Sequence, residues 1–254
     1  MVKLVDTHSH IFVSEFEDVN TIVQNAKSNG IEKILMPNID KESINDVLRV
    51  KALFPEQTEI MMGLHPCSVD KNYNEVLAAI GQQLTVSKCC AIGEIGLDYY
   101  WSKDLISEQH SALEIQLQWA IDSNLPVSLH TRNATKETID ICKNFKGLRG
   151  VFHCFGGTVA EASEIIALGM FLGIGGVLTF KNSGLDKVIE GFDLAHMVLE
   201  TDAPYLAPQP FRGKRNEPAF LLYIAEKLAQ LKDTSLQQVA DITTNNAIKI
   251  FNLS

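Results

Sequence analysis

Residues 3–10 read Lys3-Leu4-Val5-Asp6-Thr7-His8-Ser9-His10, an apolar run that ends in two histidines. Residues i and i+2 of a β-strand point to the same face, so this run predicts a strand whose end projects both imidazoles side by side. Rigid backbone that presents two imidazoles together is well suited to binding a metal ion. A single His-x-His pair is only a hypothesis, and the rest of the chain has to support it.

Similar short runs, rich in Val, Ile, Leu, Met and Gly, recur along the whole chain. Together with the first they cover residues 3–10, 32–39, 60–66, 89–98, 125–132, 149–156, 170–176 and 196–203. They are apolar throughout rather than alternating, which is typical of parallel strands covered on both faces.

Segments with helical spacing lie between most of these runs and follow the last one. We expect helices over residues 16–29, 41–53, 104–123, 135–145, 158–168, 184–191, 217–231 and 235–251. No helix is predicted between the third and the fourth strand. Strands that alternate with helices, without a linker or an internal repeat, predict an α/β protein with one TIM-type (β/α)8 barrel domain over residues 1–254.

The bulk composition is that of an ordinary globular protein, 46% hydrophobic and 21% charged in 254 residues. No run approaches the roughly 18 apolar residues of a membrane span, and the first residues do not resemble a signal peptide. Five cysteines, odd in number and without zinc-knuckle spacing, suit free thiols in a reducing compartment. We therefore expect a cytoplasmic protein. The net charge of −9 argues against a protein that coats nucleic acid, but not against an enzyme that holds it locally.

Ionisable side chains gather at the ends of six of the eight predicted strands, which is where active sites lie in this barrel fold. They are His8 and His10, His65, Glu94, His130 and Arg132, His153, and Glu200 and Asp202. One such histidine alone is more often a hydrogen-bonded rim residue than a ligand, but convergence from six strands favours a site. A buried carboxylate such as Glu94 also needs a partner, and a cation is the natural one. His110 and His196 fall outside the pattern and are expected to be non-catalytic.

The number of candidate ligands exceeds the needs of one ion, because a catalytic zinc takes about three protein ligands. The count predicts two divalent metal ions a few ångströms apart, with a carboxylate between them. Nitrogen and oxygen ligands without a thiolate suit Zn, Mn, Co or Fe and permit Mg.

Seven segments together resemble the TatD family of metal-dependent deoxyribonucleases, within the amidohydrolase-like metallohydrolases. They are Asp6-Thr7-His8-Ser9-His10, Gly63-Leu64-His65-Pro66, Gly93-Glu94-Ile95-Gly96-Leu97-Asp98-Tyr99, His130-Thr131-Arg132-Asn133-Ala134, Phe152-His153-Cys154-Phe155, Glu200-Thr201-Asp202-Ala203-Pro204-Tyr205 and Arg212-Gly213-Lys214-Arg215-Asn216-Glu217-Pro218. They stand in the family's order and span residues 6–218. Asn133 and Gln209-Pro210-Phe211 depart from the usual pattern, which bears on substrate preference rather than on the metal site.

The resemblance implies a ligand set for each of two ions. One ion would be held by His8, His10, Glu94 and Asp202, and the other by Glu94, His130 and His153. Glu94 takes the position at which many relatives in the superfamily carry a carbamylated lysine.

The resemblance also implies hydrolysis of phosphodiester bonds, as a 3′→5′ exonuclease on single-stranded DNA ends, with a role in DNA repair or degradation. Asp202 is expected to orient the attacking water and take its proton. His65 and Arg132 are expected to bind the phosphate and stabilise charge in the transition state. Glu200, one layer deeper in the barrel, is expected to support a metal ligand.

Two groups of residues after the strands leave alternatives open. Arg212, Lys214 and Arg215 are either a solvated loop or contacts to the DNA backbone. Tyr99-Tyr100-Trp101 either packs the loop against the barrel or offers a ring that stacks on an unpaired base.

The same metal ligands would also serve a metallohydrolase of small amides, lactones or phosphoesters, because fold and metal site do not fix the substrate. A non-enzymatic binding protein is disfavoured, since no proposed ligand is missing. No membrane association and no obligate protein partner are expected.

Overall fold

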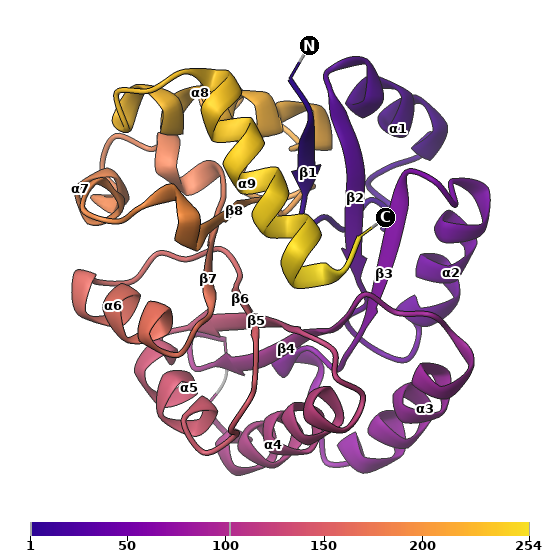
Figure 1. The fold of residues 1–254 in the computed structure, drawn as a ribbon. Helices are drawn as coiled ribbons and strands as arrows, with labels where there is room; N and C mark the ends of the chain where they lie inside the picture. Colours follow the sequence, from indigo (N-terminus) through magenta and orange to yellow (C-terminus); the bar gives the residue numbers. More distant parts are fainter. Residues whose placement is uncertain (1, 102, 254) are drawn as a thin grey trace.

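The barrel is built from eight parallel strands that pair in the order in which they follow one another along the chain (Figure 1). The computed structural model describes residues 2–101 and 103–253, so Met1 and Ser254, the ends of the predicted domain, lie outside it. The strands are β1 (Leu4–Asp6), β2 (Ile31–Pro37), β3 (Thr58–Met62), β4 (Ala91–Asp98), β5 (Val127–Arg132), β6 (Gly150–Phe152), β7 (Phe171–Ile174) and β8 (Met197–Leu199). The predicted TIM-type barrel is confirmed.

The ring closes through residues that directly follow β1 and β8. The Thr7 amide donates to the Leu199 carbonyl at 3.0 Å, and the Asp202 amide donates to the His8 carbonyl at 2.9 Å. A parallel bridge between Ser9 and Ala203 continues this seam. The closure therefore places the two N-terminal histidines next to Asp202.

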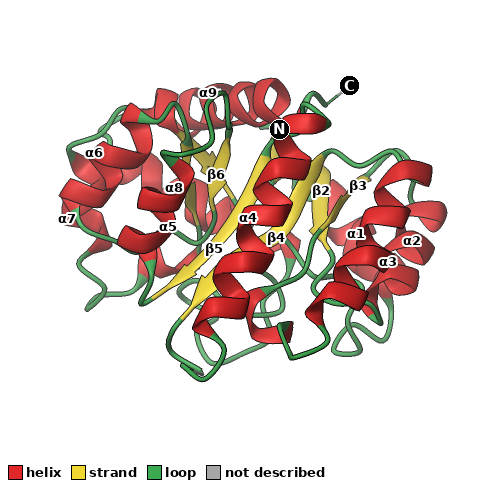
Figure 2. Ribbon diagram, turned by 90° about the horizontal axis from the view of Figure 1, so that it is seen from below, coloured by secondary structure: helices red, strands yellow, loops and turns green. Residues whose placement is uncertain are grey.

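Helices surround the ring and close one of its ends. They are α1 (Val19–Ser28), α2 (Ser43–Leu53), α3 (Tyr73–Val86), α4 (Ile106–Asp122), α5 (Thr135–Cys142), α6 (Val159–Ala167), α7 (Leu185–Glu190), α8 (Leu221–Leu231) and α9 (Leu236–Phe251). Helix α9 lies across one end of the barrel, where Ile250 and Phe251 pack against Val5 and Leu35 of the strands. The loops that follow the strands gather at the other end (Figure 2).

Helix α3 was not predicted, and each strand is shorter than the run predicted for it, β1, β6 and β8 most of all. Gly81 interrupts the helical pattern of α3, but it lets the helix approach α4, because a Cβ there would already touch Trp119 at 3.4 Å. The predicted runs 3–10, 149–156 and 196–203 contain only three strand residues each. Soon after the ends of β6 and β8, Cys154 and Asp202 adopt positive φ angles of 48° and 57°, so the extended conformation does not continue through these runs. The candidate histidines and acids there lie just beyond the strands.

No helix within residues 2–101 and 103–253 combines the length and the apolar character that crossing a membrane requires.

Candidate metal centre

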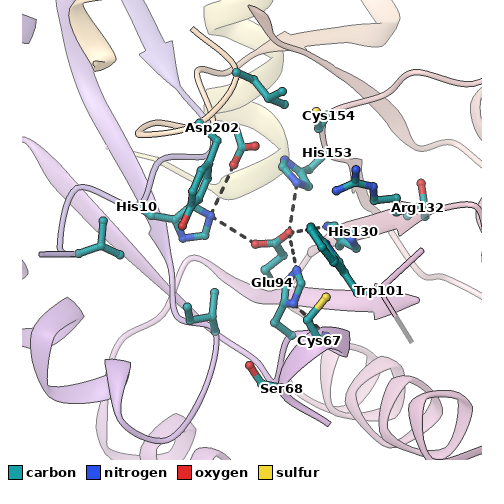
Figure 3. A pocket seen from close by; sticks show the side chains of 16 residues that line it. His10, Cys67, Ser68, Glu94, Trp101, His130, Arg132, His153, Cys154 and Asp202 are labelled. Atoms are coloured by element: carbon teal, nitrogen blue, oxygen red, sulfur yellow. Dashed lines mark hydrogen bonds and ion pairs between the residues drawn. The ribbon is translucent and has the colours of Figure 1, made fainter. Parts of the chain in front are cut away.

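A pocket of about 760 Å³ opens at the end of the barrel where the strands finish. Its walls come from the loops after β1, β2, β3, β4, β6 and β8 and from the strands β4 and β5 themselves. Figure 3 shows the side chains of His10, His130, His153 and Asp202 arranged around Glu94. The residues that the sequence predicts to be metal ligands, from strands far apart in the chain, thus meet in one place.

Glu94 of β4 lies at the centre of this arrangement and is almost fully buried. Burial alone would raise its pKa, but the neighbouring His65, His8 and His153 hold the pKa well below its ordinary value. The group is therefore a buried carboxylate surrounded by ring nitrogens. Oε2 contacts His8 Nε2 at 3.1 Å and His10 Nε2 at 3.4 Å, and Oε1 contacts His130 Nδ1 at 3.0 Å, His153 Nε2 at 3.1 Å and His65 Nε2 at 3.4 Å.

Two glycines of β4 let this strand approach β5 closely enough to bring Glu94 and His130 together. A Cβ at Gly93 would lie 2.8 Å from the Ser128 Cβ. At Gly96 the φ angle is +146°, and a Cβ would lie only 1.9 Å from the His130 carbonyl oxygen. A larger residue at either position would push the two strands apart.

The hydrogen bonds of three imidazoles decide which ring nitrogen faces Glu94. His153 Nδ1 contacts Glu200 Oε1 at 3.1 Å, and His130 Nε2 contacts Asp98 Oδ2 at 2.9 Å. His8 Nδ1 meets the Ser128 hydroxyl at 3.0 Å. A ring that donates its proton outward keeps a lone pair on the inward nitrogen, which is the arrangement that metal-ligating histidines use.

His65 has the opposite arrangement. The Cys67 amide donates to His65 Nδ1 at 3.0 Å, so the proton of the neutral ring lies on Nε2, the atom that faces Glu94. Burial lowers the pKa of this ring and favours the neutral form. His65 thus presents an N–H donor to the pocket, although His65, Glu94 and His130 place ligand atoms close enough to hold an ion.

His10 and Asp202 face each other across the ring closure. His10 Nε2 lies 3.5 Å from Asp202 Oδ1, and its buried Nδ1 has no hydrogen-bond partner. Burial would lower the pKa of His10, but the contacts with Asp202 and Glu94 outweigh it and raise the pKa to about 9. Burial alone would raise the pKa of Asp202, but the hydrogen bond from His10 outweighs burial and lowers the pKa below its ordinary value.

Divalent cations fit this donor set. Without a cation, His130 and His153 each satisfy two carboxylates only if both ring nitrogens carry a proton, and the facing Nε2 atoms of His8 and His10 are 3.3 Å apart. A cation would replace these protons and accept the inward lone pairs. Two of the residue groups that place ligand atoms within 4.8 Å of one another are His8 with Glu94 and His153, and His8 with His10 and Asp202.

Glu200 lies deeper in the barrel than Asp202, as expected, and is fully buried. Besides His153, it accepts a hydrogen bond from the Cys154 amide, while its Oε2 has no partner. Asp6 is buried nearby, and this burial raises its pKa to about 8 despite hydrogen bonds from Thr201. Two buried acids, Glu200 and Asp6, therefore contact the proposed ligands from behind.

Arg132 reaches the pocket, whereas the basic residues after β8 lie outside its lining. The Arg132 guanidinium lies 3.9 Å from the ring centre of Tyr100. Arg212 stacks over Phe180 at 3.9 Å, and Lys214 is exposed. Arg215 is held by the Glu15 carbonyl at 2.6 Å and by Glu217 at 2.9 Å, as well as stacking over Phe16 at 4.8 Å. Arg212 and Lys214 are therefore the more available cations.

Tyr99, Tyr100 and Trp101 separate into two roles. Tyr99 stacks on His110 with its hydroxyl bonded to that ring, so both pack away from the pocket. Tyr100 and Trp101 are exposed, and Trp101 lines the pocket. The packing alternative thus holds for Tyr99 only.

Sequence reasoning missed several residues of the site. Asp98 and Ser128 hold His130 and His8, and the position of Ser128 inside an apolar strand run gives no sign of this. Cys67 and Cys154 line the pocket, and nothing in cysteine spacing indicated it. The Asp98 carboxylate directly after Gly96-Leu97 was the one available signal.

Comparison with known proteins agrees with this geometry. The chain is 35% identical to the uncharacterized metal-dependent hydrolase YabD of Bacillus subtilis, over 99% of this chain and all of that protein. It is 30% identical to the uncharacterized metal-dependent hydrolase YcfH of Escherichia coli K12, over 98% and 96% of the two chains. The crystal structure of YjjV, a TatD homologue from Escherichia coli K12, superposes with a TM-score of 0.93 at 30% identity, covering 99% of this chain and 98% of the other. The model of the TatD-related DNase family matches residues 5–252, and the chain belongs to that family.

Proposed function

We propose that this TatD-family metal-dependent hydrolase cleaves phosphodiester bonds at the ends of single-stranded DNA, as a 3′→5′ exonuclease. The observation that carries the proposal is the set of inward-facing ring nitrogens around the Glu94 carboxylate, beside a pocket that also presents Arg132. Two divalent ions, Mg, Mn or Zn, are the cofactors that suit this set.

The TatD resemblance implies the ligand set, and the inward-facing ring nitrogens of His8, His130 and His153 support it. His8, His10, Glu94 and Asp202 would hold one ion, and Glu94, His130 and His153 the other. Bound ions would polarise the phosphate and lower the pKa of a water molecule, so that hydroxide is available near neutral pH. Glu200 fixes the ring of His153 that serves this set.

The remaining steps fall to side chains of the pocket. Asp202 orients the attacking water and takes its proton, since its carboxylate lines the pocket and a pKa below the ordinary value keeps it ionised. His65 donates its Nε2 proton in a hydrogen bond to a non-bridging phosphate oxygen. Arg132 pairs with the same phosphate and offsets the charge that develops in the transition state.

Outside the pocket, Arg212 and Lys214 offer positive charge to the DNA backbone, with Arg215 anchoring their loop. This local positive charge would attract the DNA backbone, although the net charge of the whole chain is −9. The five free cysteines suit a reducing compartment, and we place the protein in the cytoplasm.

A metallohydrolase of small phosphoesters, lactones or amides is the second candidate. The pocket volume of about 760 Å³ favours it, because small-molecule sites typically measure about 300–1,000 Å³.

Degradation of single-stranded DNA labelled in turn at each end tests the proposal, with Mg²⁺ or Mn²⁺ and with a Glu94→Ala control. Stepwise shortening from the 3′ end, lost with EDTA and with the substitution, supports it. If protein that is shown to contain metal leaves the DNA intact, the proposal is overturned. Small esters and amides are then the substrates to test.

A further inference from the structure

The exposed aromatic side chains of the described residues gather at the mouth of the pocket. Among large apolar side chains with substantial exposure, the aromatic ones are Tyr100, Trp101 and Tyr205, which are 55%, 68% and 51% exposed. Trp101 and Tyr205 line the pocket itself, and Tyr100 lies beneath Arg132. Exposed apolar surface grouped at one place marks a binding surface rather than chance.

Trp101 and Tyr205 come from opposite sides of the barrel. Trp101 follows β4 and Tyr205 follows β8, four strands apart in a ring of eight. Glu94 and Asp202 line the pocket that these two aromatic residues share. Any chain whose phosphate sits at the metal centre therefore has an aromatic ring on each side of that phosphate.

The backbone amides of Trp101 and Tyr205 are hydrogen-bonded to two acidic residues of the site. Asp98 Oδ1 accepts the amides of Tyr100 at 2.8 Å and Trp101 at 3.1 Å, while its Oδ2 holds His130. The Tyr205 amide donates to the Asp202 carbonyl at 2.8 Å. These bonds fix the start of each aromatic segment relative to the proposed ligands, which lowers the entropy that binding would otherwise cost.

We propose that Trp101 and Tyr205 are stacking platforms for the two unpaired nucleobases that flank the scissile phosphate. The inference rests on the proposed function and adds to it the selection of unpaired ends. Aromatic rings accept every base because each base has a π-face, and a base reaches the ring by leaving the stack of its neighbours, which costs least when the base is unpaired. Arg132, 3.9 Å from the Tyr100 ring and 5.4 Å from the Trp101 ring, supplies the charge for the phosphate between the bases.

The test removes the base and the ring in turn. The substrates are short single-stranded oligonucleotides that are intact or carry an abasic sugar on the 3′ or the 5′ side of the scissile bond. They are compared with the wild type, Trp101→Ala and Tyr205→Ala, all with metal bound. Trp101→Phe and Tyr205→Phe keep a ring, and Val86→Ala, which truncates a 73% exposed side chain of α3, is the matched control.

In the wild type we expect removal of a stacked base to lower kcat/KM by about 5- to 150-fold. In Trp101→Ala or Tyr205→Ala, removal of the base on that ring's side should change kcat/KM little, because the stack is already gone. The phenylalanine variants should retain the sensitivity. Metal content should be the same in all variants, which separates loss of stacking from damage to the metal centre.

Quenching of Trp101 fluorescence provides a readout without turnover. The second tryptophan is removed by Trp119→Phe, and a phosphorothioate-linked oligonucleotide serves as the probe. Quenching by the intact probe that is weaker with the abasic one supports the proposal. If wild-type protein cleaves DNA but base removal and ring removal act independently, the stacking inference is wrong. If the wild-type protein with metal bound cleaves none of these oligonucleotides, the proposed function itself fails.

Discussion

Glu200 reaches across β7 to His153, and a glycine between them makes this contact possible. Glu200 Oε1 lies 3.1 Å from His153 Nδ1, although the two residues follow β8 and β6. A Cβ at Gly173 of β7 would lie 2.4 Å from Glu200 Oε2 and 3.0 Å from the Cα of His153. The absent side chain therefore leaves the space in which the acid orients the ring.

Gly173→Ala should weaken metal binding. The added methyl group displaces Glu200, His153 loses the acceptor that fixes its tautomer, and we expect metal affinity to fall about 10- to 100-fold. Isothermal titration calorimetry with Mn²⁺ measures the change. Gly175→Ala is the matched control, since its Cβ would meet Glu200 only at ordinary contact distances of 3.7 Å or more. Equal affinities for the two variants would contradict the proposed role of Glu200.

His65→Ala should separate metal binding from catalysis. Because the Cys67 amide occupies Nδ1 of His65, the ring is the proposed donor to the phosphate rather than a ligand, and its loss should leave the metal content unchanged. Loss of one such donor typically lowers kcat about 100- to 1,000-fold. Metal analysis by mass spectrometry and a steady-state assay give the two values. His153→Ala is the comparison, since it should lose metal as well as activity. Metal loss in His65→Ala would instead make His65 a ligand.

The barrel could be predicted because its signals are local. Each buried parallel strand is a continuous apolar run, and the acids and histidines at the strand ends, such as Glu94 and His153, stand out against those runs. Helix α3 escaped prediction because Gly81 serves packing against Trp119 of α4, a contact between segments far apart in the chain.

The supporting contacts of the site could not be predicted for the same reason. Asp98 and Ser128 read as strand residues, and their function depends on the register of β4 against β5. The role of His65 depends on one backbone amide, that of Cys67, which only the turn after β3 brings to its ring.

Lys232→Met should lower stability without changing catalysis. Lys232 Nζ donates to the carbonyl oxygens of Ile189 at 2.6 Å, Glu190 at 3.0 Å and Phe192, at the end of α7 and far from the pocket. Methionine keeps the aliphatic stem but leaves these acceptors without their donor, which we expect to cost about 1–3 kcal/mol. Urea unfolding measures the loss. A change in kcat/KM at full folding would show that α7 communicates with the site.

Metal binding should release protons at neutral pH. Contacts with Asp202 and Glu94 raise the pKa of metal-free His10 from 6.5 to about 9, so its ring is protonated at pH 7 and must lose a proton to become a ligand. Metal affinity should therefore increase with pH and level off above about 9. In the metal-free protein the sign for stability is opposite: the folded-state pKa exceeds the unfolded one, so the contribution of His10 is complete below pH 6.5 and is lost as pH increases through about 9.

Calorimetric titration in two buffers that differ in ionisation enthalpy counts the released protons. His153, whose pKa the Glu200 and Glu94 carboxylates raise against the effect of burial, should contribute to the same release. Asp202→Asn removes one of the charges that hold the proton on His10, so it should release fewer protons at pH 7. Identical binding enthalpies in both buffers would mean that the rings are already neutral before metal binds, and that the carboxylates do not hold protons on them.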